Sequence, residues 1–304
     1  MSHLLTPLFR GIIRHSTCHV LSARLSIAQQ RQRLEWLGSL LPPPLRSRHR
    51  QIELGSRPCR QIDGHWTDPN GPVFLYLHGG AYIVGSHNSH RGMLGHLSRA
   101  AAATVYSLDY RLAPEHPAPA ATEDAVAAYR ALLDNGIAPE RIIIGGDSAG
   151  GGLTLTSTIA IRDGGLPLPA GMLLLSPVAD MTFSGSTVDI DDPMLARDWV
   201  QLGTDSYTRD IPPEDPRVSP LFADLSGLPP AMLLAGTVEM LLDDARRLKA
   251  SFDRLGVGCD YQEGDGLWHV WPYFVSSGFG PCRRAIRDIG EWSRETVASQ
   301  SIPL

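Results

Sequence analysis

The residues best suited to chemistry in this chain are those of Gly146-Asp147-Ser148-Ala149-Gly150, a serine between two glycines. A β-branched run at 142–144 precedes them and favours a buried strand, and 153–160 can form a helix. Strand, tight turn and helix together present a serine as a nucleophile, because the glycines let the backbone fold tightly on both sides. Chance yields on the order of 0.2 such pentapeptides in a chain with this glycine content. The assignment therefore depends on the rest of the chain.

An acyl transfer to Ser148 also needs a base that takes the hydroxyl proton and a carboxylate that orients the base. When an open α/β sheet carries such a set, the chain order is serine, acid, histidine. His269 is the only histidine after Ser148, and it follows the last expected strand. The order therefore predicts His269 as the base.

The acid is expected just past the strand at 231–236. Glu239 lies closest to the end of that strand and is the preferred acid, with Asp243 as the second choice. Negative charge at Asp243 and Asp244 is also favoured in the first turn of a helix, which is an alternative explanation for both residues. Asp265, in a later loop, is a further candidate.

A glycine loop, His78-Gly79-Gly80-Ala81, directly follows the apolar strand expected at 73–77. The carboxyl ends of the strands are where an open α/β sheet places its chemistry. Glycines let backbone N–H groups approach a developing oxyanion closely. The amides of Gly79, Gly80 and Ala149, the residue after the nucleophile, are therefore the predicted oxyanion hole.

The elements that must position these residues alternate between strands and helices. This alternation predicts an α/β fold with a mostly parallel sheet covered by helices on both faces. Residues 1–45 have helical periodicity, which suits a lid, a membrane-surface helix or ordinary packing. The stretch 180–225 is long for a connection inside a compact core and is interpreted as an insertion. Strands are expected at 50–54, 58–63, 73–77, 104–108, 141–145, 171–176, 231–236 and 257–263, and helices at 88–103, 119–133, from the serine to 162, 193–202, 241–255 and 281–297.

Composition excludes several classes of function. The net charge is −5 with both signs mixed, so there is no basic surface for nucleic acid. No run of about 18 apolar residues could span a bilayer, and arginines interrupt the apolar N-terminus, so we expect no stable membrane insertion and a cytoplasmic location. No zinc or disulfide pattern appears among Cys18, Cys59, Cys259 and Cys282, and no metal motif among the histidines.

Taken together, the motifs resemble the bacterial hormone-sensitive-lipase-like family (family IV esterases) of the α/β-hydrolases. The resemblance runs from about 70 to the C-terminus and rests on His78-Gly79-Gly80-Ala81, the segment 109–117, Gly146-Asp147-Ser148-Ala149-Gly150-Gly151 and 239–244. It implies an α/β-hydrolase fold of about eight strands, with a core of 46–179 and 226–304. It also implies a helical cap made of 1–45 and the 180–225 insertion, and a homodimer formed through the sheet edge.

The function that the resemblance implies is that of a serine carboxylesterase acting on short- to medium-chain esters without a cofactor. A lactone hydrolase is the close alternative. A non-catalytic receptor for a small molecule is a more distant alternative, which the presence of His269 disfavours. The apolar pocket is expected to be lined by Tyr82, Met194, Trp199, Trp268 and Val270, although each could equally serve in packing.

Two positions depart from the family pattern. Ala81 stands where the family usually has a third glycine, and a positive φ there would add roughly 1 kcal/mol of strain. Glu239-Met240-Leu241 stands where the family usually has Asp-Pro-Leu. Glutamate is one methylene longer, so the loop that carries it is expected to sit slightly further back.

Overall fold

The sheet of this protein has eight strands in the order β1-β2-β4-β3-β5-β6-β7-β8. The computed structural model describes residues 2–17 and 19–300; Cys18 lies outside them. Strands β1 and β2 form an antiparallel hairpin, β2 pairs antiparallel with β4, and the remaining pairs are parallel. The strands are β1 Arg48–Leu54, β2 Arg57–Asp63, β3 Val73–Leu77, β4 Thr104–Leu108, β5 Ile142–Asp147, β6 Gly171–Leu175, β7 Ala231–Gly236 and β8 Cys259–Gly264.

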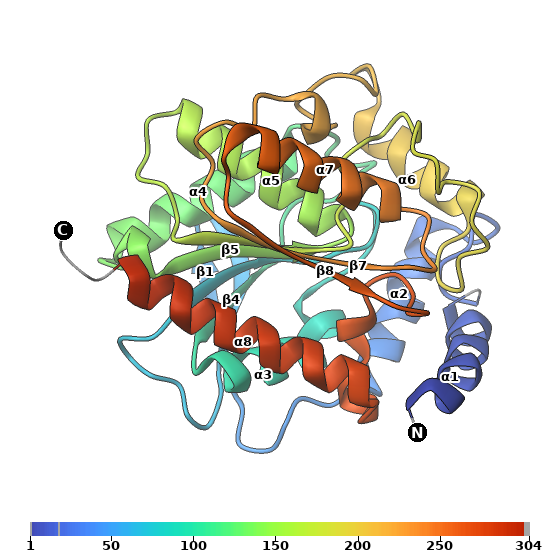
Figure 1. The fold of residues 1–304 in the computed structure, drawn as a ribbon, viewed down its shortest axis with the longest axis horizontal. Helices are drawn as coiled ribbons and strands as arrows, with labels where there is room; N and C mark the ends of the chain where they lie inside the picture. Colours follow the sequence, from blue (N-terminus) through green and yellow to red (C-terminus); the bar gives the residue numbers. More distant parts are fainter. Residues whose placement is uncertain (1, 18, 301–304) are drawn as a thin grey trace.

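Helices cover both faces of the sheet, with α4, α5 and α7 on one side and α3 and α8 on the other (Figure 1). Every residue of β3, β5, β6 and β7 is buried, as expected of parallel strands covered on both faces. The helices are α1 Ser2–Thr17, α2 Ile27–Ser39, α3 His87–Ala101, α4 Ala120–Asp134, α5 Ala149–Asp163, α6 Arg197–Thr208, α7 Leu242–Leu255 and α8 Gly280–Gln300, with short 3₁₀ turns at Pro139–Arg141, Pro220–Phe222 and Trp271–Ser277.

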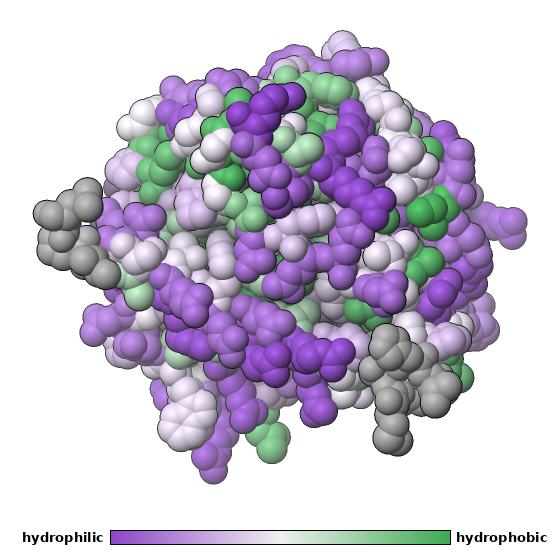
Figure 2. Space-filling view, in the orientation of Figure 1, coloured by the Kyte–Doolittle hydropathy of each residue, from purple (hydrophilic) through white to green (hydrophobic). Residues whose placement is uncertain are grey.

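Helix α8 illustrates how the chain pattern builds the layers. Its buried side chains include Cys282, Ile286 and Ile289, which recur on the face toward the sheet. The opposite face carries charged residues, and Figure 2 shows a largely hydrophilic surface over this part of the molecule. None of the helices in the described part of the chain is long and apolar enough to cross a membrane.

An outer layer lies beyond the carboxyl ends of the strands, and it consists of α1, α2 and much of the stretch 180–225, including α6 (Figure 1). The end of that stretch, residues 220–225, packs against α5 and α7 of the core. The indole N–H of Trp199 on α6 donates to Gln30 Oε1 on α2 at 2.6 Å, and both residues are buried. Arg14 on α1 forms an ion pair with Asp191 at 2.9 Å. These contacts join the N-terminal helices to the 180–225 segment.

The expected strands and most expected helices are confirmed within a few residues, and two helical predictions need correction. The helix expected at 193–202 begins only at Arg197, because Asp192 Oδ1 accepts the amides of Met194 and Leu195 in a local turn. The N-terminal region forms two helices, because Ser26 caps α2 in a capping box with Gln29.

Candidate active site

Ser148 occupies the sharp turn between β5 and α5. Its backbone has φ 53° and ψ −118°, a region that costs a non-glycine residue roughly 1–3 kcal/mol. The flanking glycines are required by space: a Cβ at Gly146 would lie 2.3 Å from Gly150 O, and one at Gly150 would lie 1.9 Å from Leu77 O. The turn thereby presents the side chain of Ser148 at the carboxyl end of the sheet.

His269 lies beside Ser148 in the wall of the same apolar cavity. Its Nδ1 is 3.6 Å from Glu239 Oε1, and both residues are fully buried. Glu239 Oε2 is fixed by Ser176 Oγ at 2.8 Å and by the amide of Gly236 at 2.9 Å, which leaves Oε1 for His269. Within the described part of the chain, Glu239 Oε1 and both ring nitrogens of His269 have no hydrogen-bond partner. The hydrogen bond between Ser148 and His269 is thus not made in this structure. Such a bond between a nucleophile and its base can tighten only when substrate binds.

The electrostatic environment of His269 favours its protonated form. Burial lowers the pKa of His269, but the carboxylates of Glu239, Asp192 and Asp147 together outweigh this effect. The net result is a pKa above the ordinary histidine value. A base in this environment takes a proton from a serine more readily than a free imidazole does.

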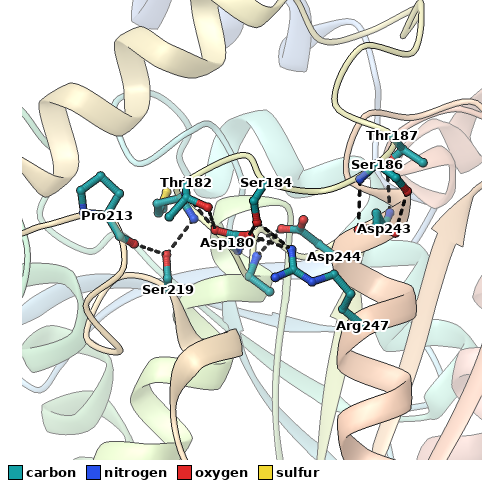
Figure 3. A network of polar contacts seen from close by, with 12 residues as sticks. Asp180, Thr182, Ser184, Ser186, Thr187, Pro213, Ser219, Asp243, Asp244 and Arg247 are labelled. Atoms are coloured by element: carbon teal, nitrogen blue, oxygen red, sulfur yellow. Dashed lines mark hydrogen bonds and ion pairs between the residues drawn. The ribbon is translucent and has the colours of Figure 1, made fainter.

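The other acidic candidates are engaged elsewhere. Asp243 accepts the amide and hydroxyl of Ser186 at 3.2 and 2.9 Å (Figure 3). Asp244 accepts the amides of Ala179 and Asp180, and burial raises its pKa to about 7. Asp265 is exposed. Of these carboxylates, Glu239 alone forms an ion pair with His269.

Asp147, the residue before Ser148, holds the glycine loop in place. Its carboxylate accepts the hydroxyl of Tyr76 at 2.8 Å and the amide of Gly79 at 3.1 Å, and it lies 3.2 Å from His90 Nε2. Burial raises the pKa of Asp147, but His90 and Tyr76 outweigh this and hold it below its usual value. The ionised carboxylate thus anchors the loop behind the serine.

This contact corrects one part of the predicted oxyanion hole. The Gly79 amide donates to Asp147, so it is not free to bind an oxyanion. The next two amides of the loop, those of Gly80 and Ala81, donate no hydrogen bond in the part of the chain that the structure describes, and neither does that of Ala149 at the start of α5. The loop amides that remain available to an oxyanion are therefore those of Gly80 and Ala81, one residue further along than the predicted pair Gly79 and Gly80.

The backbone of the loop also explains its residue types. Gly80 has φ 122°, and a Cβ there would lie 2.2 Å from Val84 O. Ala81 has φ 50°, so the strain anticipated for an alanine at this position is present. On α6, a Cβ at Gly203 would lie 2.5 Å from Ala81 Cβ. A glycine in the outer layer thus makes room for the extra methyl group of the loop.

Two cavities adjoin Ser148. One, of about 60 Å³, is lined by Met194, Trp199 and Val270. The other, of about 20 Å³, is lined by Tyr82 and Trp199. An outer groove of about 740 Å³ shares Thr17, Leu21, Met194 and Leu195 with the first cavity.

Trp268 is the exception among the predicted pocket residues, because it lines neither cavity beside Ser148. It is fully buried against Phe274 and Phe279, with ring centroids 5.9 and 5.8 Å away. Trp268 was expected in the pocket because it precedes His269 in the sequence, but its side chain packs in the core cluster that also contains residues of α8.

Several residues of the cavity were not anticipated. His90 and Tyr273 line it, as do Leu21, Leu34 and Leu37 from the N-terminal region. The apolar periodicity of the first 45 residues was a signal for burial, but it did not say against which surface. His90 had no signal of its own, since its partner Asp147 is found only in three dimensions.

A serine at a strained turn after β5, an acid after β7 and a buried histidine after β8 define an α/β-hydrolase. The family model described as an alpha/beta hydrolase fold matches residues 74–273. An acetyl-hydrolase of Streptomyces hygroscopicus is 41% identical over 244 residues, 78% of each chain. An esterase of Acinetobacter venetianus is 37% identical over 225 residues, 73% of this chain and 74% of the relative.

A solved structure identifies the family within the α/β-hydrolases. A crystal structure of an esterase from the bacterial hormone-sensitive lipase family superposes with a TM-score of 0.90 at 38% identity, covering 96% of this chain and 98% of the other. The chain belongs to this bacterial hormone-sensitive-lipase-like family of α/β-hydrolases.

Proposed function

We propose that this protein is a serine carboxylesterase in which Ser148 is the nucleophile, His269 the base and Glu239 the acid. The chain is a carboxylic ester hydrolase of its family, in line with relatives named esterase and carboxylesterase. The observation that carries the residue assignment is the buried His269, which shares a cavity with Ser148 and has its Nδ1 3.6 Å from Glu239.

The proposed reaction proceeds in two halves. His269 accepts the proton of Ser148 as its oxygen attacks the ester carbonyl, and the carboxylate of Glu239 stabilises the imidazolium that forms. The protonated His269 then gives its proton to the departing alcohol. Water, activated by the same histidine, cleaves the acyl-enzyme and releases the acid.

The oxyanion of each tetrahedral intermediate is proposed to bind the amides of Gly80, Ala81 and Ala149. These amides donate no hydrogen bond within the described part of the chain, so they can bind an oxyanion without breaking another bond, and the loss of one such donor typically costs about 3–4 kcal/mol. The mechanism uses side chains and amides that the chain itself supplies, so we propose that it needs no cofactor.

The substrate is proposed to be a small ester with a short acyl chain. The smaller cavity beside Ser148, lined by Tyr82 and Trp199, is proposed to take the acyl group, and the larger one, which leads to the outer groove, the alcohol part. The outer layer of α1, α2 and 180–225 would then act as a cap over the core. Tyr82, Met194, Trp199 and Val270 would shape the two cavities.

We also propose that the protein is a cytoplasmic homodimer. Strand β8 forms one edge of the sheet, where a second copy could pair with its free backbone groups. The buried thiols Cys59 and Cys282 are unpaired, which suits a reducing compartment.

The test of the function is hydrolysis of p-nitrophenyl acetate measured from pH 5 to 9. We expect turnover, and we expect kcat/KM to fall on the acidic side as His269 becomes protonated. Because the pKa of His269 is raised, half of the activity is expected to be lost at a pH above the ordinary histidine pKa of about 6.5. No turnover would contradict the function, and an acidic limb well below 6.5 would contradict the role of His269.

A further inference from the structure

A buried carboxylate with no part in the proposed reaction lies beside the triad. Asp192 belongs to the outer-layer segment before α6 and is only 9% exposed. Its Oδ1 accepts the amides of Met194 and Leu195 at 2.7 and 3.1 Å, and its Oδ2 accepts the amide of Met240 at 3.0 Å. Met240 directly follows Glu239. The outer layer is thus hydrogen-bonded to the loop that carries the proposed acid, Glu239.

The same segment holds the other side of that loop. Thr187 Oγ1 donates to the carbonyl of Met240 at 2.9 Å and accepts the amide of Asp243 at 3.0 Å. Figure 3 shows the adjoining contact between Ser186 and Asp243. Both polar backbone groups of Met240 are therefore occupied by residues 187–192 of the outer layer.

A second anchor fixes the start of this segment to the core. Asp180, which is fully buried, forms an ion pair with Arg247 of α7 at 2.7 Å (Figure 3). Its other oxygen accepts the hydroxyl of Thr182 at 2.5 Å. These contacts hold the segment 180–192 against the loop that carries Glu239.

The charge of Asp192 also acts on the proposed catalytic residues His269 and Glu239. Burial raises the pKa of Asp192 above its ordinary value, and the charge of Glu239 acts in the same direction, whereas His269 and the amides of Met194 and Met240 oppose this shift. Three N–H donors point at the carboxylate, so the ionised form matches its surroundings better than a form that must also donate. The charged groups around it are His269 and Glu239 of the core and Arg14 of α1. Its negative charge, with those of Glu239 and Asp147, raises the pKa of His269.

We propose that Asp192 is a positioning residue that couples the docked outer layer to the catalytic acid. By holding the Met240 amide, it keeps Glu239 Oε1 directed at His269, so the triad is complete only when residues 180–192 are docked. This inference rests on the proposed function of Ser148, His269 and Glu239.

The test is Asp192→Asn, which keeps an acceptor for the turn at Met194 but sets an amide N–H₂ against the Met240 N–H. We expect kcat for p-nitrophenyl acetate to fall by about 10- to 100-fold with little change in KM, since a small misplacement of catalytic groups has effects of this size. We also expect the acidic limb of kcat/KM to move to lower pH, because a negative charge near His269 is lost.

The matched control is Asp189→Asn, the same change on a carboxylate that is 85% exposed and paired with Arg197. It is expected to retain wild-type kcat and the wild-type acidic limb. An unchanged kcat in Asp192→Asn, a loss without movement of the acidic limb, or an equal loss in the control overturns the proposal.

Thr187→Val decides the question if Asp192→Asn does not fold. It removes the hydrogen bonds of Thr187 with the Met240 carbonyl and the Asp243 amide without changing charge, so we expect a lower kcat and an unmoved acidic limb. Full kcat in this variant overturns the proposal. All variants are compared with an active wild type, so their failure would leave the assignment of Ser148 intact.

Discussion

Replacing Ser148 by alanine is expected to lower kcat for p-nitrophenyl acetate by at least about 10⁴-fold, which leaves only the contribution of binding and the oxyanion donors. The reason is that Ser148 supplies the hydroxyl at the turn between β5 and α5, in the cavity that it shares with His269. The measurement compares initial rates of purified wild type and variant at the same protein concentration.

The fold should survive this change. Alanine removes one oxygen and keeps the Cβ, and the side chain of Ser148 makes no capping hydrogen bond to α5 that the fold would lose. The thermal unfolding midpoint of Ser148→Ala is therefore expected to match or exceed that of wild type, since the strained serine serves catalysis. Full activity in a folded Ser148→Ala would show that the ester is cleaved elsewhere.

Replacing Glu239 by glutamine is expected to cost about 10³- to 10⁴-fold in kcat, because an amide cannot stabilise the imidazolium and can hold the wrong tautomer of His269. The carboxylate of Glu239 is buried, and it is the carboxylate that contacts His269 Nδ1, at 3.6 Å, in the described part of the chain. The KM is expected to change far less, since Glu239 does not line the substrate cavities.

Asp243→Asn is the control for this prediction. Asp243 follows Glu239 closely in the chain, but its carboxylate binds Ser186. We expect less than a 10-fold loss of kcat from this change, through a slight loosening of the outer layer. A larger loss in Asp243→Asn than in Glu239→Gln would move the role of the acid to Asp243.

The order of motifs in the sequence predicted the architecture because apolar strands and glycine turns are local features. The chain order of Ser148, Glu239 and His269 then followed from the sheet topology, and the structure brings all three together. Glu239 could be preferred over Asp243 because the first residues past a strand end point toward the site, whereas the next turn belongs to a helix.

Features that depend on the direction of side chains could not be predicted from the sequence. The spacing of the glycine loop located its amides but could not tell that Asp147 occupies the amide of Gly79. Trp268 neighbours His269 in the chain, yet its ring packs against Phe279. The hydrogen bond that the Met240 amide donates to Asp192 was equally hidden, because it joins residues 48 positions apart in the chain.

The central claim, that Ser148 forms the acyl-enzyme, is tested most directly by covalent labelling. Wild-type enzyme is treated with a p-nitrophenyl alkylphosphonate, and the modified peptide is located by mass spectrometry. We expect one phosphonyl group per chain on Ser148, with activity lost in proportion to labelling, and no labelling in His269→Ala over the same time. Complete inactivation with the label on another residue, or full labelling with no loss of activity, would contradict the assignment.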